Sequence, residues 1–405
     1  MTVAAPAITD PHLLLADRLQ RRWGGLDDRS FDPYDGLAGA RLPRIVGGIR
    51  LGRLAVVHLH RRSPVNMRAL FGIPPTKSAY TVGHFASACL VIAELTGSAP
   101  ALAGARRRLE WLRSVRVGGA WTYPFDVQTR TFHYSRATPN VVCTAFAANA
   151  FLDAAEGPDD GADAALDVAL DAARFARDEL RVRRPEGTYF GYLPNDEALI
   201  HNGNLLAARL VIRAGVLADD DGLVDIGLEA LPPTLRAVAP DGSIPYGAGG
   251  SLGWVDGHHT GFVIESLADI DHLVPAAGLA SVVAPMAEYY RDRLFGADGQ
   301  ARSRPGTSYP VDALAAAQGI QTFAKLGGDH VALARRIARS TLEGMAGSGG
   351  FLYQRHRFHA KAVPYVRWAD APMCLALAEL ARSSTEPGYA PERRAGYVPE
   401  RRTGP

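Results

Sequence analysis

The feature of this sequence that most constrains its fold is a regular alternation between two kinds of helical segment. One kind is apolar on most sides and rich in small residues, and it spans residues 79–96, 138–155, 200–215, 258–272, 309–325 and 366–382. The other kind has one charged face, and it spans residues 101–116, 162–180, 217–238, 276–294 and 328–345, with residues 11–24 as a sixth partner. Helices of the first kind are buried and those of the second lie outside them. The alternation therefore predicts an all-α fold, an (α/α)6 toroid of consecutive helical hairpins.

The links between these segments differ in length according to their direction. Links from an apolar to an amphipathic segment are short, as at residues 97–100 and 273–275. The return links are long, as at residues 117–137 and 240–257. Because consecutive helices alternate in direction, all the long links must lie at one end of the ring. Long ordered loops are usually functional, so we expect a funnel lined by polar side chains at this end.

The long links share one order of residue types: glycine, aromatic side chains, a polar cluster, and then a buried helix. The order is clearest from Gly242 to Phe262 and predicts a degenerate repeat. Thr138-Pro139, Tyr309-Pro310 and Asp370 are expected to start buried helices. Each helix start carries a partial positive charge and free N–H groups, which suit anionic or hydroxyl-rich ligands.

The chain divides into three parts by the same criteria. Residues 1–60 are predicted to form an N-terminal helix and an irregular lead-in packed on the toroid, and residues 61–384 the toroid itself. Residues 385–405 repeat Gly388–Arg394 as Gly396–Arg402, are rich in proline and lack helical periodicity. We expect this tail to be disordered, with partner binding as an alternative.

Composition narrows the possible functions. The chain is 47% hydrophobic and 21% charged with a formal net charge of +2, so it has no basic field for nucleic acid. Cys89, Cys143 and Cys374 lie in apolar helical contexts without zinc-finger spacing and are predicted to be buried thiols. We find neither a signal-peptide pattern nor an uncharged apolar run long enough to span a membrane. A cytoplasmic protein is the resulting expectation.

The polar clusters at the long-loop end supply the candidate site. Residues with acid/base or charge-neutralising chemistry are predicted to be catalytic: His201, Asp256, His259, Tyr309 and Arg367. Aromatic rings stack on the apolar faces of sugars, while amides and carboxylates bind sugar hydroxyls. The residues predicted to bind substrate in this way are Trp121, Tyr123, Asp126, Asn202, Asn204, Trp254, Tyr353, Gln354, Trp368 and Asp370. The basic segment 61–68 is interpreted either as a solvated connection or as an anion-binding wall.

Several of these residues are equally suited to a purely structural role. Asn202, Asp256 and Asp370 are also suited to be helix caps, and the three tryptophans are also suited to core packing. Adjacent helical positions diverge by about 100°, so His258 and His259 are not expected to bind one metal ion together. We expect no metal and no cofactor.

Several motifs resemble the six-hairpin glycosidase-like superfamily over residues 30–385. They are His201–Leu206, His259–Phe262, Tyr365–Trp368 and the segment Arg62–Lys77. The chain looks in particular like a group of such proteins associated with bacterial polysaccharide and glycoconjugate synthesis. The superfamily includes glycosidases, uronate lyases and sugar epimerases. The resemblance implies a toroid with a sugar-directed site; because no catalytic signature of these enzymes maps onto this chain, it assigns no catalytic residue.

Two sugar chemistries compete. Hydrolysis needs two carboxyl groups roughly 5–10 Å apart, for which Asp126 and Asp256 are candidates. Epimerase or lyase chemistry on a uronate needs a base, such as His201, His259 or Tyr309, and a cation such as Arg367. The second is favoured because basic and phenolic residues outnumber paired acids, and a small-molecule or oligosaccharide substrate follows. A non-catalytic scaffold that binds glycans and a terpenoid-cyclase-like α/α barrel remain alternatives, although the latter lacks an aspartate-rich motif.

Overall fold

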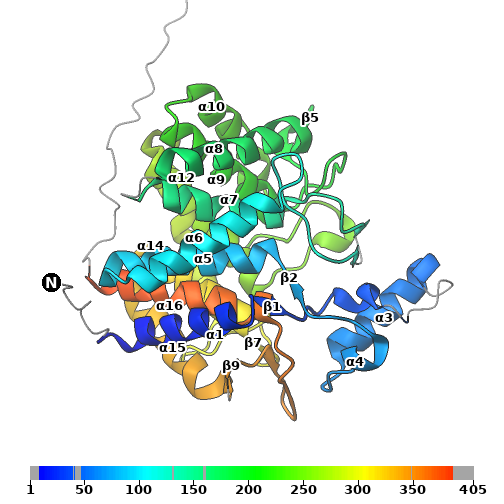
Figure 1. The fold of residues 1–405 in the computed structure, drawn as a ribbon. Coiled ribbons are helices and arrows are strands. Elements are labelled where there is room, and N and C mark those ends of the chain that lie inside the picture. The colour runs from blue at the N-terminus through cyan, green and yellow to red at the C-terminus, as the bar shows by residue number, and fades with distance from the viewer. Residues whose placement is uncertain are drawn as a thin grey trace, which may run out of the picture.

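A closed ring of paired helices forms the body of the protein (Figure 1). The computed structural model describes residues 9–39, 41, 47–129, 132–157, 161–347 and 349–385. The inner helices are α5 (Ala79–Thr96), α7 (Val141–Ala155), α9 (His201–Leu217), α12 (Gly257–Leu273), α14 (Ala313–Leu326) and α16 (Asp370–Thr385). Each packs against the next, and α16 packs against α5 and closes the ring.

The outer layer follows the predicted pairing. Its helices are α6 (Ala99–Ser114), α8 (Ala162–Phe175) with a π-helical turn (Ala176–Leu180), α10 (Asp221–Glu229) with α11 (Pro232–Leu235), α13 (Ala280–Leu294), α15 (His330–Met345) and α1 (Pro11–Gly25). Helix α1 packs on α16 and α5 and thus takes the sixth outer position. The (α/α)6 toroid predicted from the alternation is confirmed.

Small residues allow the inner helices to approach closely. A Cβ atom on Gly83 of α5 would lie 2.5 Å from the carbonyl oxygen of Phe146 on α7. A Cβ atom on Gly261 of α12 would lie 2.5 Å from the Gln318 side chain on α14. About three quarters of the residues of α5 and α7 are buried, 14 of 18 and 11 of 15, whereas α6 and α8 bury only one face. The apolar composition of the inner segments is thus a consequence of burial on both sides.

Three helix starts differ from the prediction. Helix α7 is capped by Asn140, whose side chain accepts a hydrogen bond from the Cys143 N–H, so Thr138-Pro139 lies in the preceding loop. Helix α14 is capped by Asp312, and Tyr309-Pro310 precedes it in the loop. Asp370 is the first residue of α16, but its carboxylate is bound to other elements.

The long loops lie at one end of the ring and contain short antiparallel ladders. These are β3 (Val127–Gln128) with β4 (His133–Tyr134), β5 (Arg181–Arg184) with β6 (Gly187–Phe190), and β8 (Ala346–Gly347) with β9 (Gly350–Phe351). A further sheet places β10 (Gln354–Arg355) between β7 (Val311–Asp312) and β11 (Ala360–Lys361). Single helical turns lie in two of the long loops, at Gly250–Leu252 and Val366–Trp368. Two others lie elsewhere, at Asp35–Ala38 in the lead-in and at Pro275–Ala277 in the short link after α12.

The N-terminal lead-in is more regular than the sequence suggested. Strand β1 (Arg29–Ser30) pairs with β2 (Thr76–Lys77), and between them lie α3 (Arg50–Arg62) and the short α4 (Arg68–Phe71) to one side of the ring (Figure 1). The carbonyl groups at the end of α3 bind the last long loop. Lys361 Nζ donates to the Arg61 carbonyl at 2.9 Å, and the Tyr365 hydroxyl donates to the His60 carbonyl at 3.1 Å. The lead-in therefore covers part of the long-loop end.

Helix α5 is also the one helix in the described residues that is long and apolar enough to cross a membrane by length and composition. Of its 18-residue window, 78% is buried inside the protein, as expected of an inner helix in a ring. Cys89, Cys143 and Cys374 are buried free thiols, as predicted. The predicted disorder of the tail concerns residues beyond Thr385, which lie outside the described part of the chain.

The close approach of the inner helices can be tested at Gly83. Substitution Gly83→Ala should lower the free energy of unfolding by about 1–3 kcal/mol, because the new methyl group forces the α7 backbone away. The control is Gly25→Ala at the end of α1, where a Cβ atom meets nothing within 4 Å. Chemical denaturation of both variants measures the difference; equal stability would show that the inner ring tolerates expansion.

Candidate functional site

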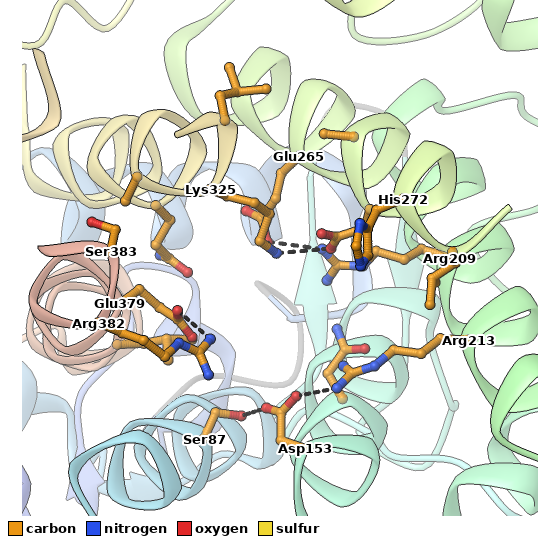
Figure 2. Close-up of a pocket in the computed structure, with 18 of the residues that line it drawn as sticks. Ser87, Asp153, Arg209, Arg213, Glu265, His272, Lys325, Glu379, Arg382 and Ser383 are labelled. Atoms are coloured by element: carbon orange, nitrogen blue, oxygen red, sulfur yellow. Dashed lines mark hydrogen bonds and ion pairs between the residues drawn. The ribbon is translucent and has the colours of Figure 1, made fainter. Parts of the chain in front are cut away.

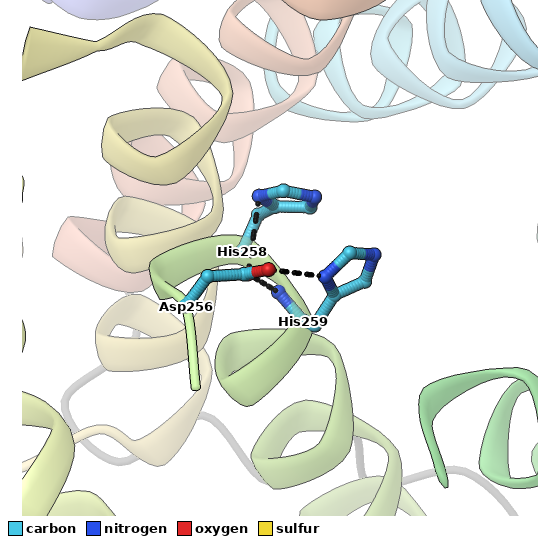
Figure 3. A group of neighbouring side chains, drawn as sticks. All are labelled: Asp256, His258 and His259. Atoms are coloured by element: carbon cyan, nitrogen blue, oxygen red, sulfur yellow. Dashed lines mark hydrogen bonds and ion pairs between the residues drawn. The ribbon is translucent and has the colours of Figure 1, made fainter. Parts of the chain in front are cut away.

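The residues that converge at the long-loop end centre on the start of α12. Asp256 is the N-cap of this helix and accepts a hydrogen bond from the His259 N–H at 3.0 Å. Its Oδ2 lies 2.6 Å from His259 Nδ1 and accepts from Trp254 Nε1 at 3.2 Å, while its Oδ1 lies 3.4 Å from His258 Nδ1 (Figure 3). An N-cap side chain faces the next three residues, so the cap holds both histidines. Asp256 is thus a cap and also the centre of a polar cluster.

The two histidines do not diverge as predicted. Their ring centroids lie 4.0 Å apart, because both rings turn back toward the N-cap carboxylate. The side-chain donor atoms of Asp256, His258 and His259 lie within 4.8 Å of one another, which would let them hold a metal ion. In the present arrangement, however, His259 Nδ1 is used in the bond to Asp256. The residues are therefore arranged as a carboxylate–imidazole pair.

Burial and neighbouring charges together lower the pKa values of both Asp256 and His258. Burial alone would raise the pKa of Asp256, but His258 and His259 outweigh it and hold that pKa well below its usual range. Burial lowers the pKa of His258 to about 3; His259, Arg61 and Arg367 add to this effect and Asp256 opposes it. An ionised Asp256 beside a neutral His258 is the state expected at neutral pH.

Aromatic side chains from two long loops, the one before α12 and the one before α16, surround this pair. Tyr246 stacks on Trp254 with ring centroids 4.5 Å apart and lies equally close to His259. Trp368 lies 5.9 Å from the His258 ring and 6.1 Å from that of Tyr353. We call the set Tyr246, Trp254, Asp256, His258, His259, Tyr353 and Trp368 the long-loop cluster. Three predicted substrate-binding aromatics, Trp254, Tyr353 and Trp368, thus meet two predicted catalytic residues, Asp256 and His259.

Two polar atoms near the cluster lack a hydrogen-bond partner among the described residues. They are Trp368 Nε1 and Asn202 Oδ1, and both are buried. A buried donor or acceptor without a partner costs about 1–3 kcal/mol. Asn202 also lines a small hollow together with Tyr246, Asp256 and His259. These atoms are therefore available to a ligand that reaches the cluster.

Two arginines lie near the cluster, and they differ in whether a carboxylate already binds the guanidinium. Arg367 binds Asp32 through two hydrogen bonds of 2.5 and 3.0 Å, and it donates to the Tyr123 hydroxyl at 3.2 Å. Its charge is thus already neutralised by a carboxylate. Arg61, from the end of α3, lies over the Tyr34 ring at 5.1 Å and hydrogen-bonds with Tyr353. Arg61 therefore has aromatic rather than acidic immediate partners.

Several predicted site residues have other roles. His201 Nδ1 lies 3.2 Å from Thr234 Oγ1, and Asn204 binds the Phe190 N–H and the Ala230 carbonyl, so both face the outer layer. Trp121 Nε1 donates to the Leu112 carbonyl, which fixes it in the core.

Three further predicted residues lie at the edges. Tyr309 is 40% exposed, Asp126 accepts from the Arg136 N–H, and Gln354 donates to Asp312 Oδ2 at 2.7 Å. Asp370 accepts hydrogen bonds from Trp23 Nε1 and the Phe351 N–H and joins α1 to β9.

Residues that the sequence did not single out complete the cluster. Tyr34 lies 5.8 Å from Trp368, and Asp32 pairs with Arg367. Both belong to a loop rich in Gly, Asp and Pro, where no periodicity marks a site residue. Arg61 belongs to the basic segment that had been interpreted as a possible anion-binding wall. In the same segment Arg68 is fully buried in an ion pair with Asp35, so it neither meets solvent nor lines a site.

The expected funnel is not open beside Asp256 and His259 in the described part of the chain. The hollow beside Asp256 and His259 has no room for a water molecule. An open cavity of about 500 Å³ lies instead at the other end of the ring, between the C-terminal halves of the inner helices (Figure 2). Each inner helix contributes a polar side chain to it, namely Ser87, Asp153, Arg209, Glu265, Lys325 and Glu379. We call this space the short-loop cavity.

Comparison with known proteins supports the fold. No protein-family model and no curated protein sequence matches the chain. Solved structures of α/α toroids do match. The unsaturated glucuronyl hydrolase from Bacillus sp. GL1, described as responsible for the degradation of glycosaminoglycan, aligns with a TM-score of 0.61 and 16% identity over 94% of this chain and 98% of that one.

Two further structures extend this result. A possible glycoside hydrolase from Salmonella enterica aligns with a TM-score of 0.62 and 14% identity over 94% of this chain and 96% of that one. The cellobiose 2-epimerase from Bacillus thermoamylovorans aligns with a TM-score of 0.56 and 13% identity over 75% and 88%. These likenesses show the fold, an (α/α)6 toroid, as the sequence predicted.

The protonation state of His258 is directly measurable. Its pKa of about 3 predicts a neutral ring in the folded protein throughout the range from pH 8 to about 4. In the denatured protein the same ring should titrate near 6.5, so this residue contributes stability above pH 6.5 that is lost as the pH falls toward 3. NMR titration of the assigned imidazole signals tests this; a midpoint above 5 in the folded state would contradict the packing of His258.

The contribution of Asp370 to stability should depend on pH in the direction opposite to that of His258. Burial raises its pKa to about 6, although the hydrogen bonds from Phe351 and Trp23 oppose the shift. Its contribution to stability is therefore full below the unfolded pKa of 3.8 and is lost as the pH rises to about 6.

Substitution Asp370→Asn should remove this dependence. The stability of the wild type relative to the variant should fall by on the order of 2 kcal/mol between pH 4 and 6. Urea denaturation at several pH values measures the difference, and a constant difference would refute the assignment.

Proposed function

We propose that this protein is a carbohydrate-active enzyme that uses the Asp256–His259 pair for acid/base chemistry on a sugar or uronic acid. The observation that carries the proposal is the 2.6 Å contact between His259 Nδ1 and the Asp256 carboxylate, surrounded by Tyr246, Trp254 and Trp368. A carboxylate beside an imidazole fixes its tautomer and stabilises its protonated form. Aromatic rings next to such a pair suit a sugar ring. The fold, shared with a glucuronyl hydrolase and a sugar epimerase, adds support.

The pair is suited to remove a proton from carbon. An ionised Asp256 accepts a hydrogen bond from the Nδ1–H of His259, which leaves the lone pair on Nε2 free to act as a general base. Abstraction of a proton next to a carboxylate places negative charge on that carboxylate, which a nearby cation must stabilise. Return of a proton to the opposite face gives an epimer, whereas loss of the neighbouring oxygen substituent gives an unsaturated sugar. We therefore favour an epimerase or lyase.

Arg61 is the better candidate for this cation. Arg367 was the prediction from sequence, but its two hydrogen bonds to Asp32 occupy the guanidinium. Arg61 instead lies between Tyr34 and Tyr353 and lacks a bidentate carboxylate partner among the described residues. Desolvation of Arg61 would be offset when a substrate carboxylate binds it.

Hydrolysis is the second candidate, and Asp312 supports it. Burial raises the pKa of Asp312, and the charge on Asp256 adds to this shift, whereas the pKa of Asp256 is lowered. Two carboxyl groups with pKa values moved apart can serve as acid and base. Asp126, the partner suggested by the sequence, lies in a surface loop instead. The Asp312 carboxylate accepts hydrogen bonds from Gln354 and from the first turn of α14. Protonation of Asp312 for a role as general acid would weaken these bonds, which makes hydrolysis the second choice.

Substrate access requires movement of the lead-in. Tyr34 lies against Trp368, and Arg61 is hydrogen-bonded to Tyr353, so both cover aromatic rings of the long-loop cluster. Displacement of residues 31–34 and of the end of α3 would expose the aromatic rings of the long-loop cluster. We place the reaction in cytoplasmic synthesis of a polysaccharide or glycosylated natural product, for which an internal epimerase is more suitable than a digestive enzyme.

Product analysis in heavy water separates the candidate functions. The full chain is incubated with oligosaccharides that contain uronic acid. Deuterium at C5 without chain cleavage identifies an epimerase, unsaturated ends a lyase, and new reducing ends a hydrolase. Binding without any of these products over days would support the non-catalytic scaffold instead.

Catalysis by the pair predicts a specific set of variants. His259→Gln and Asp256→Asn should each lower kcat by about 10²–10⁴-fold, the usual range for a lost general base. His12→Gln on α1 is the matched control and should retain full turnover. Circular dichroism checks that each variant is folded. Turnover within threefold of wild type for folded His259→Gln would exclude this residue as the base.

A further inference from the structure

The short-loop cavity has the dimensions of a ligand site and lies at the end of the ring opposite the long-loop cluster. Its volume of about 500 Å³ falls within the range of about 300–1,000 Å³ typical of small-molecule sites. On the side toward the long loops, Phe146, which lines the cavity, contacts the rings of Tyr80 and Phe262 at 4.5 and 5.3 Å. At the short-loop end the axis is left open, and charged side chains line it (Figure 2).

The charged side chains form networks on the walls and do not close the space. Arg209 and Lys325 each bind both Glu265 and Asp269 at 2.9–3.0 Å. On another wall, Arg213 binds Asp153 at 2.7 Å and Glu156 at 3.0 Å. These bonds hold the side chains in fixed positions. Burial alone would raise the pKa of Glu265, but Lys325 and Arg209 outweigh it and lower that pKa, so its carboxylate stays ionised.

The lining has an excess of negative charge. Seven carboxylates line the cavity against four basic side chains, the latter being Arg209, Arg213, Lys325 and Arg382. In addition, all six inner helices end at this side of the ring, and each helix C-terminus carries a partial negative charge of about half an elementary charge. A low-dielectric space with this lining attracts cations and repels anions.

The deep part of the cavity offers hydrogen-bond acceptors without partners. His84 is 2% exposed, and its Nδ1 lies 2.9 Å from the Tyr80 carbonyl, so Nδ1 carries the proton and Nε2 is left as an acceptor. Asn149 is 8% exposed, and its Oδ1 has no hydrogen-bond partner in the described residues. The ring of Phe146 lies beside His84 at 4.6 Å and also lines the cavity. An ammonium group can satisfy such acceptors and bind an aromatic face at the same time.

We infer that the short-loop cavity binds a small organic cation with primary ammonium groups, such as an aliphatic polyamine. The ammonium hydrogens would bind His84 Nε2, Asn149 Oδ1 and the ionised wall carboxylates, with Phe146 as an aromatic contact. A ligand of this kind would also neutralise the excess charge at six helix ends. The inference is independent of the reaction proposed for the long-loop cluster, which uses different residues at the opposite end of the ring.

Calorimetric titration of the full chain with spermidine at low ionic strength tests the inference. Saturable binding is expected, and it should weaken as salt is raised because the attraction is electrostatic. Two neutral or anionic probes serve as controls: 1,4-butanediol and glucuronate should show no binding at this end. Absence of spermidine binding, or competition between glucuronate and spermidine, would overturn the inference.

A variant that places a cation in the cavity locates the site. Ala268→Lys on α12 adds an ammonium group to the cavity wall and should weaken spermidine binding at least tenfold. Ala276→Lys in the adjacent turn adds the same charge at an exposed position and should change affinity less than twofold.

A second variant keeps the test decisive if Ala268→Lys does not fold. Ser383→Lys should weaken binding in the same direction. Unchanged affinity in folded Ala268→Lys and Ser383→Lys would show that spermidine binds elsewhere and would overturn the inference.

Discussion

The close side-by-side packing of six inner helices is the constraint on which the other features of this protein depend. Gly83 and Gly261 show how little space separates neighbouring helices, since a single methyl group would collide with the next one. Helices packed in this way around a ring, each followed by an outer return helix, all point in one direction. Their N-termini and long loops therefore gather at one end, and their C-termini and short links at the other.

This single arrangement explains why the two ends differ in chemistry. At the long-loop end, helix caps such as Asp256 and Asp312 are required by free N–H groups, and a carboxylate there is stabilised by the helix dipole. A cap also faces the first turn of its own helix, which is why Asp256 can hold His259. At the short-loop end the same dipoles are negative, and ionised carboxylates beside them need the neighbouring cations Arg209, Arg213 and Lys325. The local charge thus follows from helix direction.

The sequence was sufficient to predict the toroid, because burial on both sides leaves a periodic record in every inner helix. It also placed Asp256, His259, Trp254 and Trp368 at one end, since helix direction alone determines which end a residue occupies. The sequence could not show whether a side chain at this end points toward the ring axis or toward the outer layer. His201 and Asn204 start an inner helix as predicted, but they face Thr234 of the outer layer, because the fine rotation of α9 decides this. Asp32, Tyr34 and α3 were missed because their roles depend on contacts with residues some 300 positions away, such as Arg367 and Lys361.

The N-terminal lead-in determines which side chains at the long-loop end already have partners. Two of its side chains contact the helical turn before α16: Asp32 pairs with Arg367, and Tyr34 lies against Trp368. Without this segment the Arg367 guanidinium would lose its carboxylate partner, and the Trp368 ring would lose its aromatic neighbour Tyr34. The two hydrogen bonds from Arg367 to Asp32 fix this guanidinium, whereas Arg61 has no such carboxylate partner among the described residues. The lead-in therefore has two effects at the long-loop end. It neutralises Arg367 through Asp32, and it carries Arg61 to the edge of the long-loop cluster, where Tyr353 is its hydrogen-bond partner.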